Sequence, residues 1–318
     1  MIPGDSKLLY QWNFIISDLI PKQVKLKKKI WLKKGEILLE KNGEDLHLYL
    51  LGTEDRHSSN DKKIIPYLWM SSLLTNNAPE LSNAGGCSIS SADKLGTGCI
   101  LTCTMSVNIP DEAVNDIENY VHRFLNYIRR LHDKYIDIIS ENEFISIALD
   151  YFNNAEKKFV YSDEGFISAI ISLESLFNED PSDVKYKLSH RAGFLLGLSD
   201  IDPVNAFEKL KKFYNHRSSL VHGGGTASYD PDRHLISHFT RKAISIFLIL
   251  LSNPERREIG RQKRKEKILK EIDYAMLDPE KRKSLKREIN KGLKTFSMKI
   301  PRTFEGSGKN GDYRITAW

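Results

Sequence analysis

The chain has 318 residues, of which 40% are hydrophobic and 28% are charged, a composition typical of folded proteins. Its three cysteines are too few for a disulfide framework and lack the C-x-x-C spacing of a zinc knuckle, which predicts a cytoplasmic protein. No apolar run is long enough to span a bilayer, and the N-terminus does not resemble a signal peptide. No glycine-rich segment carries the lysine of a nucleotide-binding P-loop. We therefore expect no membrane association and no cofactor.

The formal net charge of +6 is unevenly distributed along the chain. Residues 254–318 contain 19 Lys and Arg against 10 Asp and Glu, whereas the rest of the chain contains 29 against 32. The basic surface is therefore a C-terminal feature. Such a segment either follows RNA phosphates or forms a solvated helix face, and the sequence leaves both interpretations open.

The first 110 residues have the pattern of a β-rich segment. Asn42-Gly43 separates two β-prone runs, and this dipeptide favours the tight turn of a hairpin. A third β-prone run, residues 98–110, is rich in β-branched side chains and ends at a proline. The sequence predicts a small, mainly β N-terminal domain here, and it assigns this domain no role.

The pattern changes to helical spacing after Pro110. Apolar residues alternate at intervals of three and four, which places one continuous seam along a helix. The seam comprises Val114, Ile117, Val121, Phe124, Ile128, Leu131, Tyr135 and Ile138. Such a seam packs against another helix, either in the same chain or in a partner.

Capping residues predict the helices that follow. Ser140 to Glu143 has the pattern of a capping box, and Asp163 opens the next helix. Asp202-Pro203 and Asp230-Pro231 each combine a capping carboxylate with a proline suited to the first helical position. We expect helices over residues 140–158, 163–177, 182–196, 203–222 and 231–252, and two basic helices over 255–277 and 279–294.

These patterns together predict an α+β protein with four parts. Residues 1–110 form the mainly β domain, and residues 111–139 form a long connecting amphipathic helix. An all-α bundle spans residues 140–253, and a basic helical tail spans residues 254–318.

The end of the helix predicted at 203–222 carries the residues best suited to chemistry. Arg217 offers a planar, permanently charged fork of donors for a phosphate, and His222 exchanges a proton near neutral pH. Five residues apart on a regular helix, the two side chains point roughly 140° away from each other. They would meet on one phosphate only at a distorted helix end or across a two-fold axis, where each arginine faces the histidine of a second copy.

The surrounding residues resemble the signature of HEPN domains, in particular of the Apea-like HEPN branch. The matching pattern, Y-x-x-R-S-x-x-V-H-G, comprises Tyr214, Arg217, Ser218, Val221, His222 and Gly223. Glu174 and Arg191, on the two preceding helices, are similar to the glutamate and arginine that accompany this signature. The resemblance covers residues 140–253.

The resemblance implies a dimeric helical bundle that cleaves RNA without a metal. The ribose 2′-hydroxyl would attack the adjacent phosphate and leave a cyclic phosphate end. His222 would act as general acid or base, and Arg217 would stabilise the charge developing on the phosphate. Glu174, Arg191, Tyr214 and Ser218 would support the site, and Ser218 stands where the family often has Asn. The implied biological role is that of a defence or toxin-type effector.

Alternatives remain open at each position. Arg217 and His222 would also suit a purely structural helix C-terminus, where cations are favoured, and Glu174 and Arg191 would suit an interhelical ion pair. His190 and His216 are expected to be solvated or locally hydrogen-bonded.

A metal site is a further alternative. His234 and His238 have a spacing that can bind zinc, although no third ligand is apparent.

Three functions follow. We expect a dimeric endoribonuclease with RNA as substrate. The first alternative is a catalytically silent HEPN-fold interaction or dimerisation module, and the second is a module that binds RNA without cutting it. In each case the N-terminal domain is a candidate site for a regulatory protein or ligand.

Overall fold

The computed structural model describes the backbone of residues 8–16, 29–33, 37–42, 45–51, 70, 73, 80–82, 101–107, 117–157, 162–222, 232 and 234–296. It describes the side chains of residues 70, 73, 126–156, 162–222, 232 and 235–296. The chain divides into two compact units. One comprises Met1–Ser71, Asn77–Arg130 and Met298–Trp318, and the other comprises Ser72–Asn76 and Leu131–Ser297.

In the part of the first unit that the structure describes, six strands pair in the order β2-β3-β4-β1-β6-β5. The strands are β1 (Leu8–Ile16), β2 (Lys29–Lys33), β3 (Ile37–Asn42), β4 (Asp45–Leu51), β5 (Glu80–Ser82) and β6 (Leu101–Val107). β1 runs antiparallel to β4 and parallel to β6. β3 and β4 pair antiparallel with Asn42 opposite Asp45, as the predicted hairpin requires, and Gly43 lies outside the described residues.

The fold class predicted from the sequence, α+β with a mainly β N-terminal domain, is wrong. Residues 126–296 are 87% helical and contain no strand. A sheet makes a domain only when it has a hydrophobic core of its own, and none of the side chains that the structure describes belongs to a strand. The described core is therefore that of a helical bundle, and no β domain is shown.

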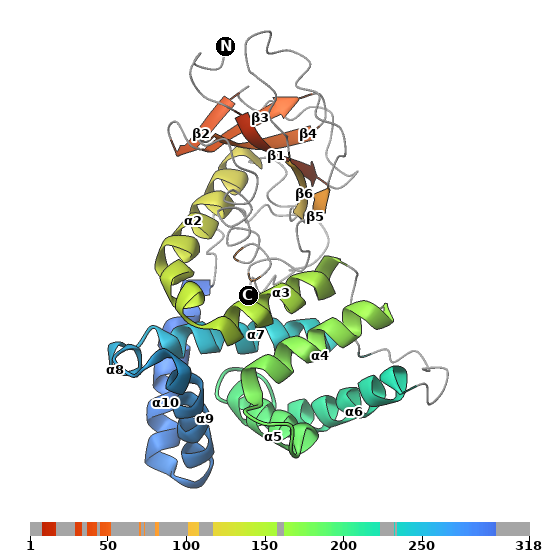
Figure 1. The fold of residues 1–318 in the computed structure, drawn as a ribbon. Helices are drawn as coiled ribbons and strands as arrows, with labels where there is room; N and C mark the ends of the chain where they lie inside the picture. The colour runs from red at the N-terminus through yellow and green to blue at the C-terminus, as the bar shows by residue number, and fades with distance from the viewer. Residues whose placement is uncertain are drawn as a thin grey trace, which may run out of the picture. The chain divides into compact units, whose positions relative to one another are not determined.

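The bundle is built from helices that pack in neighbouring pairs. They are α2 (Ile117–Glu141), of which the part from Leu131 onward belongs to this unit, α3 (Glu143–Lys157), α4 (Asp163–Phe177), α5 (Val184–Gly197), α6 (Pro203–Val221), α7 (His234–Leu251), α8 (Pro254–Arg257), α9 (Arg261–Leu277) and α10 (Pro279–Leu293), followed by the 3-10 turn η2 (Lys294–Phe296). α3 packs beside α4, α5 beside α6, and α9 beside α10 (Figure 1). α7 contacts α3, α4 and α10, which makes it the central helix.

The sequence of α7 explains its central position. A helix that is apolar on all sides is stable only when other elements surround it. The fully or almost fully buried apolar side chains of this helix are Ile236, Phe239, Ala243, Ile244, Ile246, Phe247, Leu248, Ile249, Leu250 and Leu251. Phe247 packs edge-on against Phe144 of α3 and Phe177 of α4. The bundle is thus organised around α7.

The basic helices are part of this packing. Their inner faces bury apolar side chains that include Ile268, Ile272 and Ile289. A Cβ atom on Gly292 of α10 would lie 2.3 Å from Cγ2 of Ile249, so only glycine permits the observed approach of α10 to α7. The helical part of the predicted tail, residues 254–296, therefore belongs to the same compact unit as α3 to α7.

The seam of α2 is filled by this chain in the described part of the helix. Ile128, Leu131, Tyr135 and Ile138 are all buried. The Tyr135 ring stacks on Phe296, with ring centroids 5.3 Å apart. This part of the seam is therefore not a free surface for a partner chain.

Helix start signals were predicted with mixed success. Asp202 accepts a hydrogen bond from the Asn205 N–H at 2.6 Å, which confirms the predicted start of α6. The capping box at Ser140 is wrong, because α2 continues through Ser140 to Glu141 and α3 begins at Glu143. The Ser140 hydroxyl instead donates to the Asp137 carbonyl. The signal at Asp230-Pro231 lies outside the described residues.

Candidate functional site

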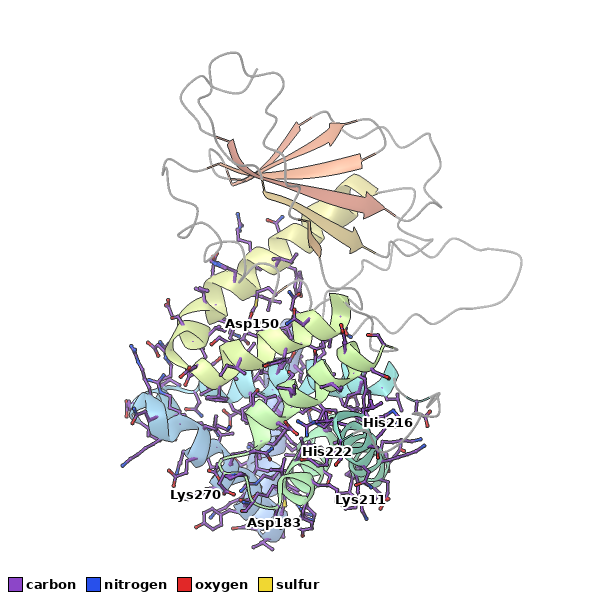
Figure 2. All side chains as sticks on the ribbon, turned by 45° about the vertical axis from the view of Figure 1, so that its right-hand side comes forward. Asp150, Asp183, Lys211, His216, His222 and Lys270 are labelled. Atoms are coloured by element: carbon purple, nitrogen blue, oxygen red, sulfur yellow. The ribbon has the colours of Figure 1, made fainter. Side chains whose placement is uncertain are left out.

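The candidate site lies at the C-terminal end of α6. The backbone N–H of His222 donates to the Ser218 carbonyl at 3.1 Å, so His222 closes the last turn of the helix. Its side chain is exposed, and no described residue hydrogen-bonds to its ring. Lys211, His216 and His222 are labelled along this helix and its end in Figure 2. His222 is therefore accessible from solvent.

Arg217 occupies a different face of α6 from His222. It follows Phe213, which is fully buried, by four residues and therefore shares its inward face. Its side chain is only 22% exposed and approaches α4, where Nη2 lies 3.7 Å from Oε2 of Glu174. One copy of the chain thus holds Arg217 partly buried against α4 and His222 exposed at the end of α6.

The contact between Arg217 and Glu174 leaves the arginine incompletely satisfied. A separation of 3.7 Å is an ionic contact and too long for a hydrogen bond. The buried Nε of Arg217 finds no acceptor among the residues that the structure describes. The guanidinium also lies over the ring of Tyr214, 6.0 Å from its centroid. Arg217 is therefore positioned by Glu174 and Tyr214, and its Nε has no acceptor among the residues that the structure describes.

Burial sets the electrostatics of this cluster. Burial raises the pKa of the Glu174 carboxyl, and the positive charge of Arg217 opposes the shift. Burial also raises the pKa of Tyr214, the negative charge of Glu174 raises it further, and Arg217 lowers it. The tyrosine hydroxyl is consequently held protonated. Glu174, Tyr214 and Arg217 thus form a partly buried charged cluster with one cation and one anion.

Arg191 uses its donors on other partners. Nε and Nη2 bind the two carboxylate oxygens of Asp273 at 2.9 and 2.6 Å, and Nη1 donates to the Phe177 carbonyl at 3.0 Å. Glu179 adds an ionic contact at 3.6 Å. Burial lowers the pKa of Arg191, but the contacts with Asp273 and Glu179 outweigh it and the net shift is upward. Arg191 therefore ties α5 to α9 and to the end of α4.

Ser218 meets His222 through its backbone. The Ser218 carbonyl accepts the His222 N–H, and its side chain is half-buried. The predicted site residues therefore divide into three groups. Glu174, Tyr214 and Arg217 come together, His222 and Ser218 meet through the last helical turn, and Arg191 is committed to Asp273.

His216 and His190, which flank the two arginines in the sequence, both pack against aromatic rings. The His216 ring packs edge-on against Phe166, with centroids 5.2 Å apart. His190 is exposed and stacks on Tyr186, and it also contacts the edge of Phe207. Sequence reasoning missed this ring cluster, although the spacing of four between Tyr186 and His190 was visible on the predicted helix.

Metal chemistry finds no support in the described part of the chain. No group of three or more His, Cys, Asp or Glu residues there is arranged to hold a metal ion. The side chain of His234 lies outside the described residues. Within the same part of the chain, no helix has the length and apolar character required to cross a membrane.

Comparison of the chain with protein-family models, with curated proteins and with solved structures found no match in any of the three.

Proposed function

We propose that this protein is a cytoplasmic, metal-independent endoribonuclease of the HEPN type that acts as a dimer. The observation that carries the proposal is the state of the two key side chains. Arg217 is held by Glu174 at 3.7 Å with a donor left without an acceptor among the described residues, and His222 is exposed at the end of the same helix. In the proposal, the biological role is that of a defence or toxin-type effector.

In the proposed reaction His222 takes the proton from a ribose 2′-hydroxyl. The 2′-oxygen forms a bond to the adjacent phosphorus, and the bond from phosphorus to the 5′-oxygen breaks. The departing 5′-oxygen receives a proton, which the protonated His222 returns directly or through solvent. The products are a 2′,3′-cyclic phosphate and a 5′-hydroxyl end, and the step consumes neither water nor a metal ion. Arg217 stabilises the negative charge that develops on the phosphate oxygens.

A second copy of the chain completes the proposed site. On a regular helix the directions of Arg217 and His222 differ by roughly 140°, so in the proposal one phosphate is bound by residues of two copies. A two-fold axis beside the end of α6 would bring Arg217 of one copy to the partner subunit's His222. The exposure of His222 and of Val221, which is 49% exposed, supports a contact between copies at this end.

A silent interaction module of the same fold is the second candidate. The contact between Arg217 and Glu174 favours it, because a buried arginine paired with a carboxylate also has a purely structural explanation. In this case His222 only closes the helix. Removal of the His222 imidazole should reduce RNA cleavage if the protein is a nuclease. It should change no reaction if the protein is an interaction module.

A cleavage assay separates these candidates. Wild type, His222→Ala and the control His132→Ala, which removes a histidine of α2 that contacts Asp133, are incubated with a mixed RNA pool in EDTA. We expect wild type and the control to produce fragments with cyclic phosphate ends, and His222→Ala to lose about 10²–10⁴-fold in rate. Equal cleavage by His222→Ala, or cleavage that EDTA abolishes, would contradict the proposal. Absence of cleavage in all three favours the interaction module.

A further inference from the structure

An exposed cluster of aromatic rings lies on the helical hairpin formed by α5 and α6. The rings of Tyr186 and His190 stack with centroids 5.1 Å apart and an interplanar angle of 27°. The edge of His190 meets Phe207 of α6 at 5.9 Å. The ammonium group of Lys211 lies 5.7 Å from the centroid of Phe207. Tyr186 is 60% exposed, so one side of this stack faces solvent.

The backbone of the hairpin holds these rings in place. A Cβ atom on Gly193 of α5 would lie 3.0 Å from Cβ of Phe207, and one on Gly197 would lie 2.5 Å from Cβ of Pro203. The two glycines therefore let α5 and α6 approach closely. Because this approach fixes the ring of Phe207 beside α5, the stack is preorganised without being buried.

The hairpin also relates the rings to the candidate catalytic site. Gly193 lies beside Phe207 and Gly197 beside Pro203, so the antiparallel register brings Tyr186 level with Tyr214, about one turn before Arg217. On α6 itself, Phe207, Lys211 and His222 fall within a stripe of about 60°. The distance along the helix from Lys211 to His222 is about 16 Å, or about five nucleotides of a stacked strand.

The charges around the rings suit a polyanion. Lys185, Lys211 and Lys212 are exposed on the two helices, against the exposed Glu208. Exposed aromatic rings that are interleaved with lysines are the usual elements of single-strand binding, because bases stack on the rings and the phosphates approach the cations. Tyr186 is 60% exposed and stacks on His190, so burial in the core does not account for its position.

We propose that the α5–α6 hairpin is a binding site for single-stranded RNA, on which bases stack against Tyr186 and His190 while Lys211 contacts a phosphate. The stripe on α6 then leads the strand toward His222. This inference rests on the proposed function, because it states that the RNA reaches the proposed nuclease site as a single strand.

Binding is measured by fluorescence anisotropy with the full chain and a labelled single-stranded RNA in which every ribose carries a 2′-O-methyl group. This probe lacks the attacking hydroxyl, so binding is measured apart from cleavage. We expect Tyr186→Ala to weaken binding about 10-fold, since a stacked base contributes about 1–3 kcal/mol, and Tyr186→Trp to retain it. The control Tyr274→Ala removes a tyrosine of α9 that is 55% exposed and should leave affinity unchanged.

The inference is overturned if Tyr186→Ala binds as tightly as wild type, or if Tyr274→Ala weakens binding equally. An unfolding temperature of Tyr186→Ala equal to that of wild type excludes a folding defect. The two proposals also fail separately. If Tyr186→Ala loses RNA binding but His222→Ala still cleaves RNA, only the proposed nuclease site is contradicted. If Tyr186→Ala binds RNA as wild type does but His222→Ala no longer cleaves it, only the proposed stacking site is contradicted.

Discussion

Two arginines, Arg191 and Arg217, each face carboxylates from another helix, but they differ in how fully their donors are used. Arg191 makes hydrogen bonds through Nε, Nη1 and Nη2 and is 11% exposed on its side chain. Arg217 makes one ionic contact at 3.7 Å and leaves its Nε without an acceptor among the described residues. A fully satisfied guanidinium stabilises the fold, whereas one with unused donors is available to a ligand. The comparison supports a structural role for Arg191 and, within the proposed function, a chemical role for Arg217.

The largest expected difference between the two arginines is in activity. Arg217→Lys keeps the charge but loses the planar fork that fits a phosphate, so we expect RNA cleavage to fall roughly 10²–10³-fold. The measured quantity is the cleavage rate per folded molecule in EDTA. Arg287→Lys on α10, an exposed arginine, is the matched control and should cleave as wild type. A wild-type rate in the Arg217→Lys variant would remove Arg217 from the proposed mechanism.

The next largest effect is in stability. Arg191→Met keeps the apolar stem and removes the hydrogen bonds to Asp273 and Phe177, so we expect the free energy of unfolding to fall by about 2 kcal/mol. Urea unfolding followed by circular dichroism measures this loss. Cleavage per folded molecule should not change. If Arg191→Met instead abolishes cleavage at unchanged stability, Arg191 belongs to the site after all.

A smaller effect is expected from Lys265, which lies in the same region as Arg191. Burial lowers its pKa from 10.5 to about 8, with Glu179 opposing the shift and Arg191 adding to it. Between these two pKa values the unfolded chain holds a proton that the folded chain has lost. Stability should therefore rise with pH in that window.

The window is best sampled between pH 8 and 9.5. We expect wild type to gain about 1 kcal/mol of unfolding free energy there relative to Lys265→Met. Urea unfolding at the two pH values measures the difference, and parallel curves for the two proteins would contradict the lowered pKa.

The smallest effect is the coupling within each ion pair. Double-mutant cycles with Glu174→Gln and Arg217→Met should give a coupling energy of about 0.5 kcal/mol, because the contact has no hydrogen bond. The cycle with Asp273→Asn and Arg191→Met should give a larger value. Equal coupling energies in the two cycles would contradict the conclusion that Arg191 is bound more tightly to its carboxylate than Arg217 is.

The sequence predicted local features better than distant ones. Asp202-Pro203 starts α6 and Asp278-Pro279 starts α10 as predicted, because a cap and its proline act within one turn. The box at Ser140 failed because the buried seam of α2 extends the helix past it. The α+β assignment failed for a related reason, since β-prone runs predict strands without showing that their side chains form a core.

The candidate site was predictable only in part. Helical spacing alone separates Arg217 from His222, and the family resemblance pointed to Glu174 and Tyr214. The partner of Arg191 was not predictable, because Asp273 lies 82 residues further along the chain. The ring cluster was missed for the same reason, since Phe207 reaches His190 only through the close approach at Gly193.

The most direct test of the composite site is complementation between two inactive variants. Arg217→Ala and His222→Ala are each assayed alone and after unfolding and refolding together. If Arg217 of one copy works with the partner subunit's His222, mixed dimers contain one intact site of two, and the mixture should recover about a quarter of wild-type cleavage. A mixture as inactive as each variant alone, while wild type refolded in the same way cleaves RNA, would contradict the composite site.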